Sequence, residues 1–251
     1  MSVLFYLASG IGSYVVVTLS LFSLGQRVPR ASFSARCLAS YASLLICAAY
    51  GVVASVILRL CRRGRISQWA AGRSFKWAMW YTTGIMFDVV QGSEYLSTRP
   101  AVFIANHQSE LDVLMLGSVF PKYCSMTAKK SLKLIPFLGW FMVLSRTVFI
   151  DRGNRQTALK AVDGAAKEMQ LHKQSVFMFP EGTRSYSLKP DLLPFKKGAF
   201  HLAVQANVPI VAVVVENYSH LLNPRACIFE PGRIKVKGEF SCMCISISST
   251  S

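Results

Sequence analysis

The sequence Ala101-Val-Phe-Ile-Ala-Asn-His-Gln-Ser-Glu-Leu-Asp112 has the pattern of a strand followed by a helix. The fold of the rest of the domain can be predicted from this unit. Its first five residues are apolar, as in a buried strand, and an apolar run with helical spacing continues to about residue 120. His107 and Asp112 stand between the two runs. Residues five apart lie on different faces of a regular helix, so these side chains meet only if His107 lies in a turn and Asp112 lies in the first turn of the next helix.

Two interpretations of residues 106–112 stay open on these residues alone. In the first, a neutral His107 removes the proton of a hydroxyl that attacks a thioester carbonyl, and Asp112 holds the ring in the required tautomer. In the second, Ser109-x-x-Asp112 before an apolar run is a capping box, and His107 is a buried core histidine. Ser109 is the expected N-cap. The heptapeptide favours neither interpretation.

From about residue 74 onward, short β-rich runs alternate with stretches of helical period. We expect strands at 101–106, 122–128, 146–151, 175–179, 209–216 and 233–237, and helices at 110–120, 131–143, 155–173 and 197–206. This alternation predicts an α/β fold with a mixed, largely parallel sheet flanked by helices. The apolar stretch 134–143, which contains Trp140, is too short to span a bilayer, and we expect a core helix there rather than an interfacial one.

Two apolar segments precede this α/β region. Residues 1–26 and 37–58 contain no charged side chain, and each is long enough to cross a hydrocarbon core of ~30 Å. Residues 1–73 are therefore expected to form two membrane-anchoring helices with basic flanks. Alternatively, the second segment enters the bilayer, reverses near Gly51 and leaves on the side from which it entered.

The chain carries 28 Lys and Arg against 12 Asp and Glu, and its first acidic residue is Asp88. Nine cations precede Asp88: Arg27, Arg30, Arg36, Arg59, Arg62, Arg63, Arg65, Arg73 and Lys76. Basic residues beside apolar segments predict contact with an anionic bilayer surface and argue against nucleic-acid binding. The seven cysteines are odd in number and lack a C-x-x-C pair, so we expect neither a disulfide framework nor a metal site.

Three further charged clusters follow predicted strands or begin a predicted helix. The turn 179–185 (FPEGTRS) places a carboxylate, a hydroxyl and a guanidinium where α/β sheets bind ligands. Two more cations are candidates for binding phosphate. They are Arg152 in VFIDR and Lys196 at the start of a predicted helix. The alternatives are a solvated loop with a Glu181–Arg184 pair, a strand-end salt bridge and solvated lysines. The candidate binding residues are Arg152, Glu181, Gly182, Thr183, Arg184 and Lys196.

With NHQSELD, VFIDR, FPEGTRS and VPIVAVVV in this order, residues 74–238 resemble the glycerolipid acyltransferases, and most closely the 1-acyl-sn-glycerol-3-phosphate acyltransferase branch. The resemblance implies acyl-CoA as co-substrate with no further cofactor, and lysophosphatidic acid as acceptor, giving phosphatidic acid. It assigns His107 as general base and Asp112 as its orienting partner. It places Arg152 and residues 181–184 in acceptor binding. It also implies an integral membrane protein of the endoplasmic reticulum with a cytosolic catalytic domain.

Residues 239–251 do not resemble the continuation usual in this family, and we expect an atypical, disordered tail that leaves a sheet edge uncovered. Two alternative functions follow. One is an acyltransferase for another lysophospholipid or for glycerol 3-phosphate. The other is a truncated, non-catalytic protein that binds membrane lipids.

Overall fold

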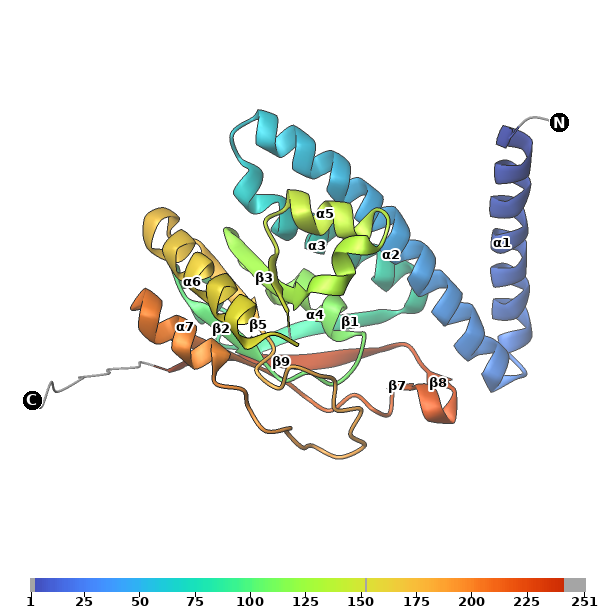
Figure 1. Cartoon of the computed structure of the whole chain (residues 1–251). Helices are drawn as coiled ribbons and strands as arrows, with labels where there is room; N and C mark the ends of the chain where they lie inside the picture. The colour runs from blue at the N-terminus through green and yellow to red at the C-terminus, as the bar shows by residue number, and fades with distance from the viewer. Residues whose placement is uncertain (1–2, 152, 242–251) are drawn as a thin grey trace, which may run out of the picture.

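The computed structural model describes residues 3–151 and 153–241. Arg152 and residues 242–251 lie outside the described residues, as do the expectations attached to them. The described chain has a central sheet with helices on both faces, and two long N-terminal helices precede it (Figure 1).

The sheet has seven strands in the order β1-β9-β6-β2-β5-β3-β4. The strands are β1 (Ile85–Gln91), β2 (Val102–Ala105), β3 (Cys124–Lys129), β4 (Val148–Ile150), β5 (Ser175–Met178), β6 (Ile210–Val215) and β9 (Gly232–Ser241). Five of the six neighbouring pairs are parallel and the β6–β9 pair is antiparallel. The predicted mixed, largely parallel sheet is therefore confirmed. A short hairpin of β7 (Leu222–Asn223) and β8 (Ile228–Phe229) lies apart from it.

The two faces of the sheet bury separate clusters of apolar side chains. Phe103 and Phe177 point to the face covered by α3 (Ser67–Thr83) and α4 (Asp112–Val119). The adjacent residues, such as Val102 and Val176, point to the face covered by α6 (Arg155–His172) and α7 (Gly198–Ala206), because successive side chains alternate along a strand. Short 3-10 turns complete the chain: η1 (Gly64–Ile66), η2 (Tyr95–Ser97), η3 (Lys130–Leu134) and η4 (Pro224–Ala226).

The structure corrects three expectations about secondary structure. The single helix expected over 131–143 is divided at Pro136 into η3 and α5 (Leu138–Leu144), because proline lacks the N–H that a continuous helix needs. Strand β1 was not predicted.

The third correction concerns the predicted tail. β9 continues past the expected strand end, and residues 239–241 are part of it because they pair antiparallel with β6, as in Phe240 opposite Val211. β9 lies between β1 and β6 and is an interior strand of the sheet. It pairs with β1 over residues 232–237 and with β6 over residues 236–241, so residues 239–241 pair with β6 alone.

The N-terminal helices α1 (Val3–Gly25) and α2 (Pro29–Leu60) have mean hydropathies of 1.7 and 2.1 and are long and apolar enough to cross a membrane. α1 projects away from the sheet in Figure 1, whereas α2 buries a row of small residues, including Ala35, Ala39 and Ser43, against the domain. α2 passes through Gly51 without a break, so a reversal at that residue is not observed.

α5 lies against α2 at Gly51. A Cβ atom built on Gly51 would lie 2.6 Å from Cδ2 of Phe141, which is too close for an unstrained contact. The small residue is therefore what lets the Phe141 ring rest on α2.

We predict that Gly51→Val separates α5 from α2 and lowers the stability of the protein by about 1–3 kcal/mol, the usual cost of overpacking. Thermal unfolding in detergent would measure the loss. The double variant Gly51→Val with Phe141→Ala should recover much of it. Gly12→Val is the matched control because no atom lies within 4 Å of a Cβ there. Equal melting temperatures for Gly51→Val and Gly12→Val would contradict the packing.

Candidate active site

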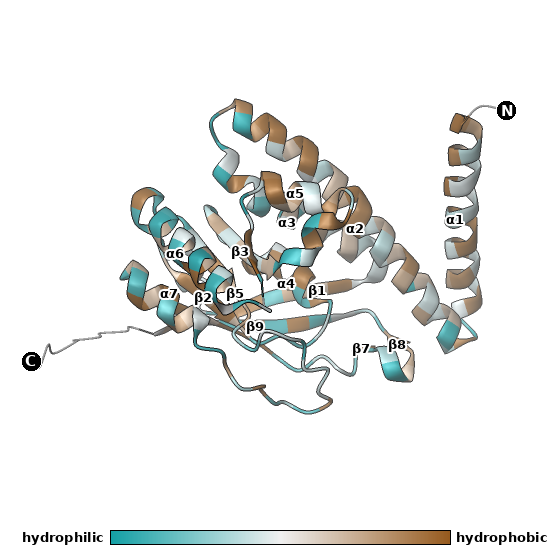
Figure 2. Ribbon diagram, in the orientation of Figure 1, coloured by the Kyte–Doolittle hydropathy of each residue, from teal (hydrophilic) through white to brown (hydrophobic). Residues whose placement is uncertain are grey.

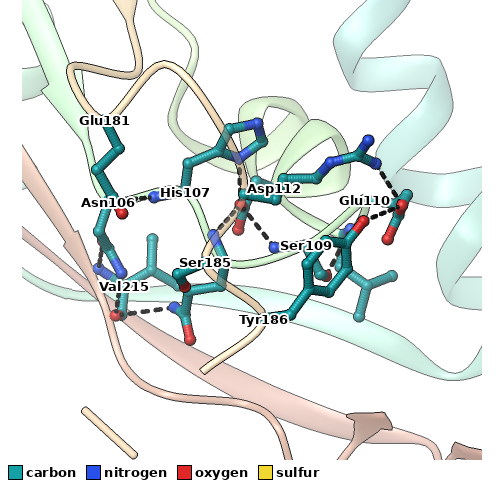
Figure 3. Close-up of polar contacts among 12 residues, drawn as sticks. Asn106, His107, Ser109, Glu110, Asp112, Glu181, Ser185, Tyr186 and Val215 are labelled. Carbon is teal, nitrogen blue, oxygen red and sulfur yellow. Dashed lines mark hydrogen bonds and ion pairs between the residues drawn. The ribbon is translucent and has the colours of Figure 1, made fainter. Parts of the chain in front are cut away.

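His107 and Asp112 meet across the turn between β2 and α4, the one arrangement in which their spacing allows contact. Nδ1 of His107 lies 2.7 Å from Oδ2 of Asp112 (Figure 3). The Asp112 side chain is fully buried, and the His107 side chain is 16% exposed. One member of the pair is thus removed from water while the other reaches the surface of the site.

The Asp112 carboxylate accepts three further hydrogen bonds. Oδ2 accepts the backbone N–H of Gln108 at 2.6 Å and that of Ser109 at 3.1 Å, and Oδ1 accepts the Tyr218 hydroxyl at 2.6 Å. A backbone N–H can only donate, so Oδ2 is an acceptor and Nδ1 of His107 is its proton donor. Nε2 of a neutral imidazole then carries the free lone pair.

The two interpretations of the heptapeptide are not exclusive. Asp112 accepts the Ser109 N–H, as the acidic residue of a capping box does, and it bonds the imidazole at the same time. The expectation that Ser109 is the N-cap is wrong: Leu111 has that position, because residues 109–111 form an additional turn before α4. The Ser109 hydroxyl instead accepts the Leu111 N–H at 3.1 Å.

Glu181 and Phe179 hold His107 from the turn after β5. The buried Glu181 carboxylate accepts the His107 N–H at 2.6 Å through Oε1 and the Leu193 N–H at 3.0 Å through Oε2. The Phe179 ring stacks on the imidazole, with centroids 4.0 Å apart and planes 10° from parallel. Glu181 therefore joins two loops and fixes the backbone of the histidine, and it does not pair with Arg184.

Backbone and amide contacts lock the same turn to neighbouring strands. The N–H groups of Ser185 and Tyr186 donate to the carbonyls of His107 and Gln108 at 2.9 and 3.0 Å. The Asn106 amide donates to the Val215 carbonyl at 3.0 Å and accepts the Val215 N–H at 2.9 Å. The turn that carries His107 is thus fixed by the chain following β5 and by the end of β6.

Glu110, Arg184 and Tyr186 form a polar cluster beside the turn. Arg184 pairs with the Glu110 carboxylate, and the Tyr186 hydroxyl donates to Glu110 Oε1 at 2.6 Å (Figure 3). Burial and then the hydrogen bond to Glu110 raise the pKa of Tyr186 to about 12. Its hydroxyl therefore stays protonated at neutral pH and remains a donor.

The remaining predicted binding residues are Gly182, Thr183, Lys196 and Arg152. Gly182 has a φ of +69°, and the Lys196 side chain lies over it, so that a Cβ on Gly182 would be 2.7 Å from Nζ. The structure thus brings Gly182 and Lys196 together, while Thr183 is exposed on the same turn. Arg152 is not described, but the preceding Asp151 lies at the end of β4.

An open pocket of about 340 Å³ borders the residues that follow His107 in the turn. Its lining residues include Gln108, Ser109, Tyr186, Leu188, Tyr218 and Leu222. The sequence did not single out Tyr218 or Tyr186. Tyr218 follows the end of β6, as the predicted site residues follow other strands, but only the fold shows that its hydroxyl reaches Asp112. Burial and the charge of Asp112 raise the pKa of Tyr218 well above its ordinary value.

The comparison with known proteins agrees with this fold. A family model described as "Acyltransferase" matches residues 89–216. The yeast 1-acyl-sn-glycerol-3-phosphate acyltransferase is 47% identical over 191 residues, covering 76% of this chain and 63% of the yeast protein. The human 1-acyl-sn-glycerol-3-phosphate acyltransferase beta is 37% identical over 225 residues, covering 87% of this chain and 77% of the human protein.

A solved structure has the same fold. The 1-acyl-sn-glycerophosphate (LPA) acyltransferase PlsC from Thermotoga maritima superposes with a TM-score of 0.59 at 22% identity, over 90% of this chain and 84% of that chain. The fold and the family model thus define an α/β acyltransferase. Within that class, the chain belongs to the 1-acyl-sn-glycerol-3-phosphate acyltransferase family.

We predict that Tyr218→Phe destabilises the protein by about 1–3 kcal/mol, because it leaves a buried carboxylate oxygen without its donor. Thermal unfolding of the full chain in detergent would measure the effect. Tyr95→Phe is the control, since Tyr95 is 37% exposed. A melting temperature for Tyr218→Phe as high as that of Tyr95→Phe would show that the hydroxyl does not support Asp112.

Proposed function

We propose that this protein transfers an acyl group from acyl-CoA to the free hydroxyl of lysophosphatidic acid, forming phosphatidic acid in phospholipid biosynthesis. The observation that carries the proposal is the orientation of His107. Its Nδ1–H is bonded to the buried Asp112, which leaves Nε2 as the basic nitrogen. The names of the yeast and human relatives support the choice of acceptor.

In the proposed reaction, Nε2 of His107 removes the hydroxyl proton as the hydroxyl oxygen attacks the thioester carbonyl carbon. The positive charge that forms on the imidazole is stabilised by the Asp112 carboxylate, whose oxygens also accept backbone and hydroxyl donors. Collapse of the tetrahedral intermediate breaks the carbon–sulfur bond, and the imidazolium returns its proton to the CoA thiolate. No covalent acyl-enzyme is formed.

The acceptor phosphate is bound, in this proposal, by the turn after β5 and the cations near it. Arg184 supplies a planar, bidentate donor and Lys196 a second positive charge, while Thr183 adds a hydroxyl. Gly182 allows Lys196 to approach the turn, and Glu181 fixes its geometry. Arg152 is assigned to the same phosphate from the family motif alone.

Arg184 must change partner for this binding. Without substrate it pairs with Glu110, and both side chains are partly exposed. An exposed ion pair contributes about 0.2–1 kcal/mol, so a doubly charged phosphate can replace Glu110 at little cost. Glu110 then keeps the Tyr186 hydroxyl as its donor.

We also propose that the protein resides in the endoplasmic reticulum membrane with the catalytic domain in the cytosol. The two apolar helices support membrane insertion. The six cations that follow the second apolar segment, from Arg59 to Lys76, outnumber the three that precede it, which favours the cytosol for the domain after them. Protection of the catalytic domain from protease in sealed microsomes would count against it.

We predict that His107→Ala lowers acyl transfer by roughly 10²- to 10⁴-fold, the usual contribution of a general base. Release of CoA thiol by the full chain in membranes would be measured with and without lysophosphatidic acid. His201→Ala, on the exposed side of α7, should leave the rate unchanged.

The same assay separates the alternatives. If thiol release depends on glycerol 3-phosphate or another lysophospholipid and not on lysophosphatidic acid, the acceptor is that other compound. Absence of turnover in the unaltered chain would indicate a lipid-binding protein. Normal turnover by His107→Ala would rule out the mechanism.

We predict that Arg184→Ala raises KM for lysophosphatidic acid by about 10- to 100-fold, since charge-assisted hydrogen bonds are lost, and leaves KM for acyl-CoA nearly unchanged. Glu110→Gln should lower KM for lysophosphatidic acid about 2- to 5-fold by releasing Arg184. Arg233→Ala, which breaks a pair with Asp88 on another part of the sheet, is the control. Equal changes in both KM values for Arg184→Ala would indicate a structural role.

A further inference from the structure

Residues 130–144, the segment of η3 and α5, expose large apolar side chains on a domain surface. The sequence predicted a core helix here, but the structure leaves half of the segment's ten large apolar residues exposed. They are Leu134 (85% exposed), Ile135 (42%), Phe137 (40%), Trp140 (54%) and Val143 (51%). Single exposed apolar residues are common, whereas a contiguous group of them indicates a surface that contacts something apolar.

The segment lies directly against a helix that is apolar enough to cross a membrane. Phe141 of α5 rests on Gly51 of α2, and α2 itself exposes apolar residues along its length, including Leu45, Val53 and Ile57. Figure 2 shows hydrophobic residues on both helices where they lie side by side. The exposed surface of α5 therefore adjoins the helix that would enter the bilayer.

The charged residues within the segment are all lysines. Residues 113–150 contain no aspartate or glutamate, and Lys129, Lys130 and Lys133 stand immediately before the apolar residues. Lys129 and Lys133 are exposed, whereas Lys130 pairs with Asp151 at 3.2 Å. Lysines next to exposed apolar and tryptophan side chains are typical of segments that lie at an anionic membrane surface.

The position of the segment relative to the strands connects it to the active site. η3 follows the carboxyl end of β3, and the carboxyl end of β4 lies beside it through the Lys130–Asp151 pair. β2, which carries the His107 turn at its carboxyl end, belongs to the same parallel set. Carboxyl ends of parallel strands share one edge of a sheet, so the segment begins at the edge that holds the site.

We infer that residues 130–144 dock on an anionic lipid bilayer and insert Leu134, Phe137 and Trp140 among the headgroups. The segment is too short to span, and Pro136 interrupts its helix, so it lies within the interface. This contact brings the carboxyl edge of the sheet to the membrane surface, where a lipid acceptor is found. The inference does not depend on the proposed reaction.

Quenching of tryptophan emission by brominated lipids tests the depth of Trp140. The full chain and its Trp140→Phe variant would be placed in vesicles of phosphatidylcholine and phosphatidylserine with bromines at chosen depths. The difference between the two proteins isolates Trp140 from the other three tryptophans. We expect it to be quenched most by the bromines that lie closest to the boundary between headgroups and acyl chains.

A matched control places a tryptophan on α6, which covers the other face of the sheet. Leu171, on α6, is 76% exposed, and Trp140→Phe combined with Leu171→Trp should show no additional quenching over Trp140→Phe alone. Quenching of Trp140 should increase with the fraction of phosphatidylserine, and Lys129→Gln with Lys133→Gln should flatten that dependence.

The inference would be overturned if, at every lipid composition, Trp140 were quenched no more than the tryptophan introduced at position 171. Quenching that is strong but independent of phosphatidylserine in the unaltered chain would overturn the role of the lysines. Because no turnover is measured, failure here leaves the proposed reaction untouched, and an inactive chain that is still quenched supports docking.

Discussion

The buried carboxylate of Asp112 is the group on which the site depends. It accepts hydrogen bonds from the His107 ring, two backbone N–H groups and the Tyr218 hydroxyl. A buried charge is costly unless its hydrogen bonds are satisfied, so the turn, α4 and the chain after β6 are all constrained to supply these donors. The orientation of the imidazole follows from the same requirement.

Two buried carboxylates hold His107, one at its ring and the other at its backbone. Asp112 holds the ring, whereas Glu181 holds the backbone N–H of His107 and connects it to Leu193. The Phe179 ring covers one face of the imidazole. These groups come from strands that are neighbours in the sheet but distant in sequence, so the site forms only when the parallel sheet is assembled.

The helix α2 serves both the membrane and the domain. Its small residues pack against α3 and allow Phe141 of α5 to rest on Gly51, while its remaining surface is apolar and exposed. A segment that the sequence presents as an anchor is therefore also a covering layer of the catalytic domain. This arrangement places α5, and with it the exposed Trp140, beside the helix expected to enter the bilayer.

The amino-acid sequence was sufficient to predict the two apolar helices and the mixed sheet, because apolar periodicity is a local property. It limited any meeting of His107 and Asp112 to a turn between a strand and a helix, but only the structure shows that the two side chains meet. It did not predict β1, the length of β9, or Tyr218 as a donor to Asp112. Whether Arg184 pairs with Glu181 or Glu110 was likewise decided by tertiary structure. Those features depend on contacts between segments far apart in the chain, which local pattern does not encode.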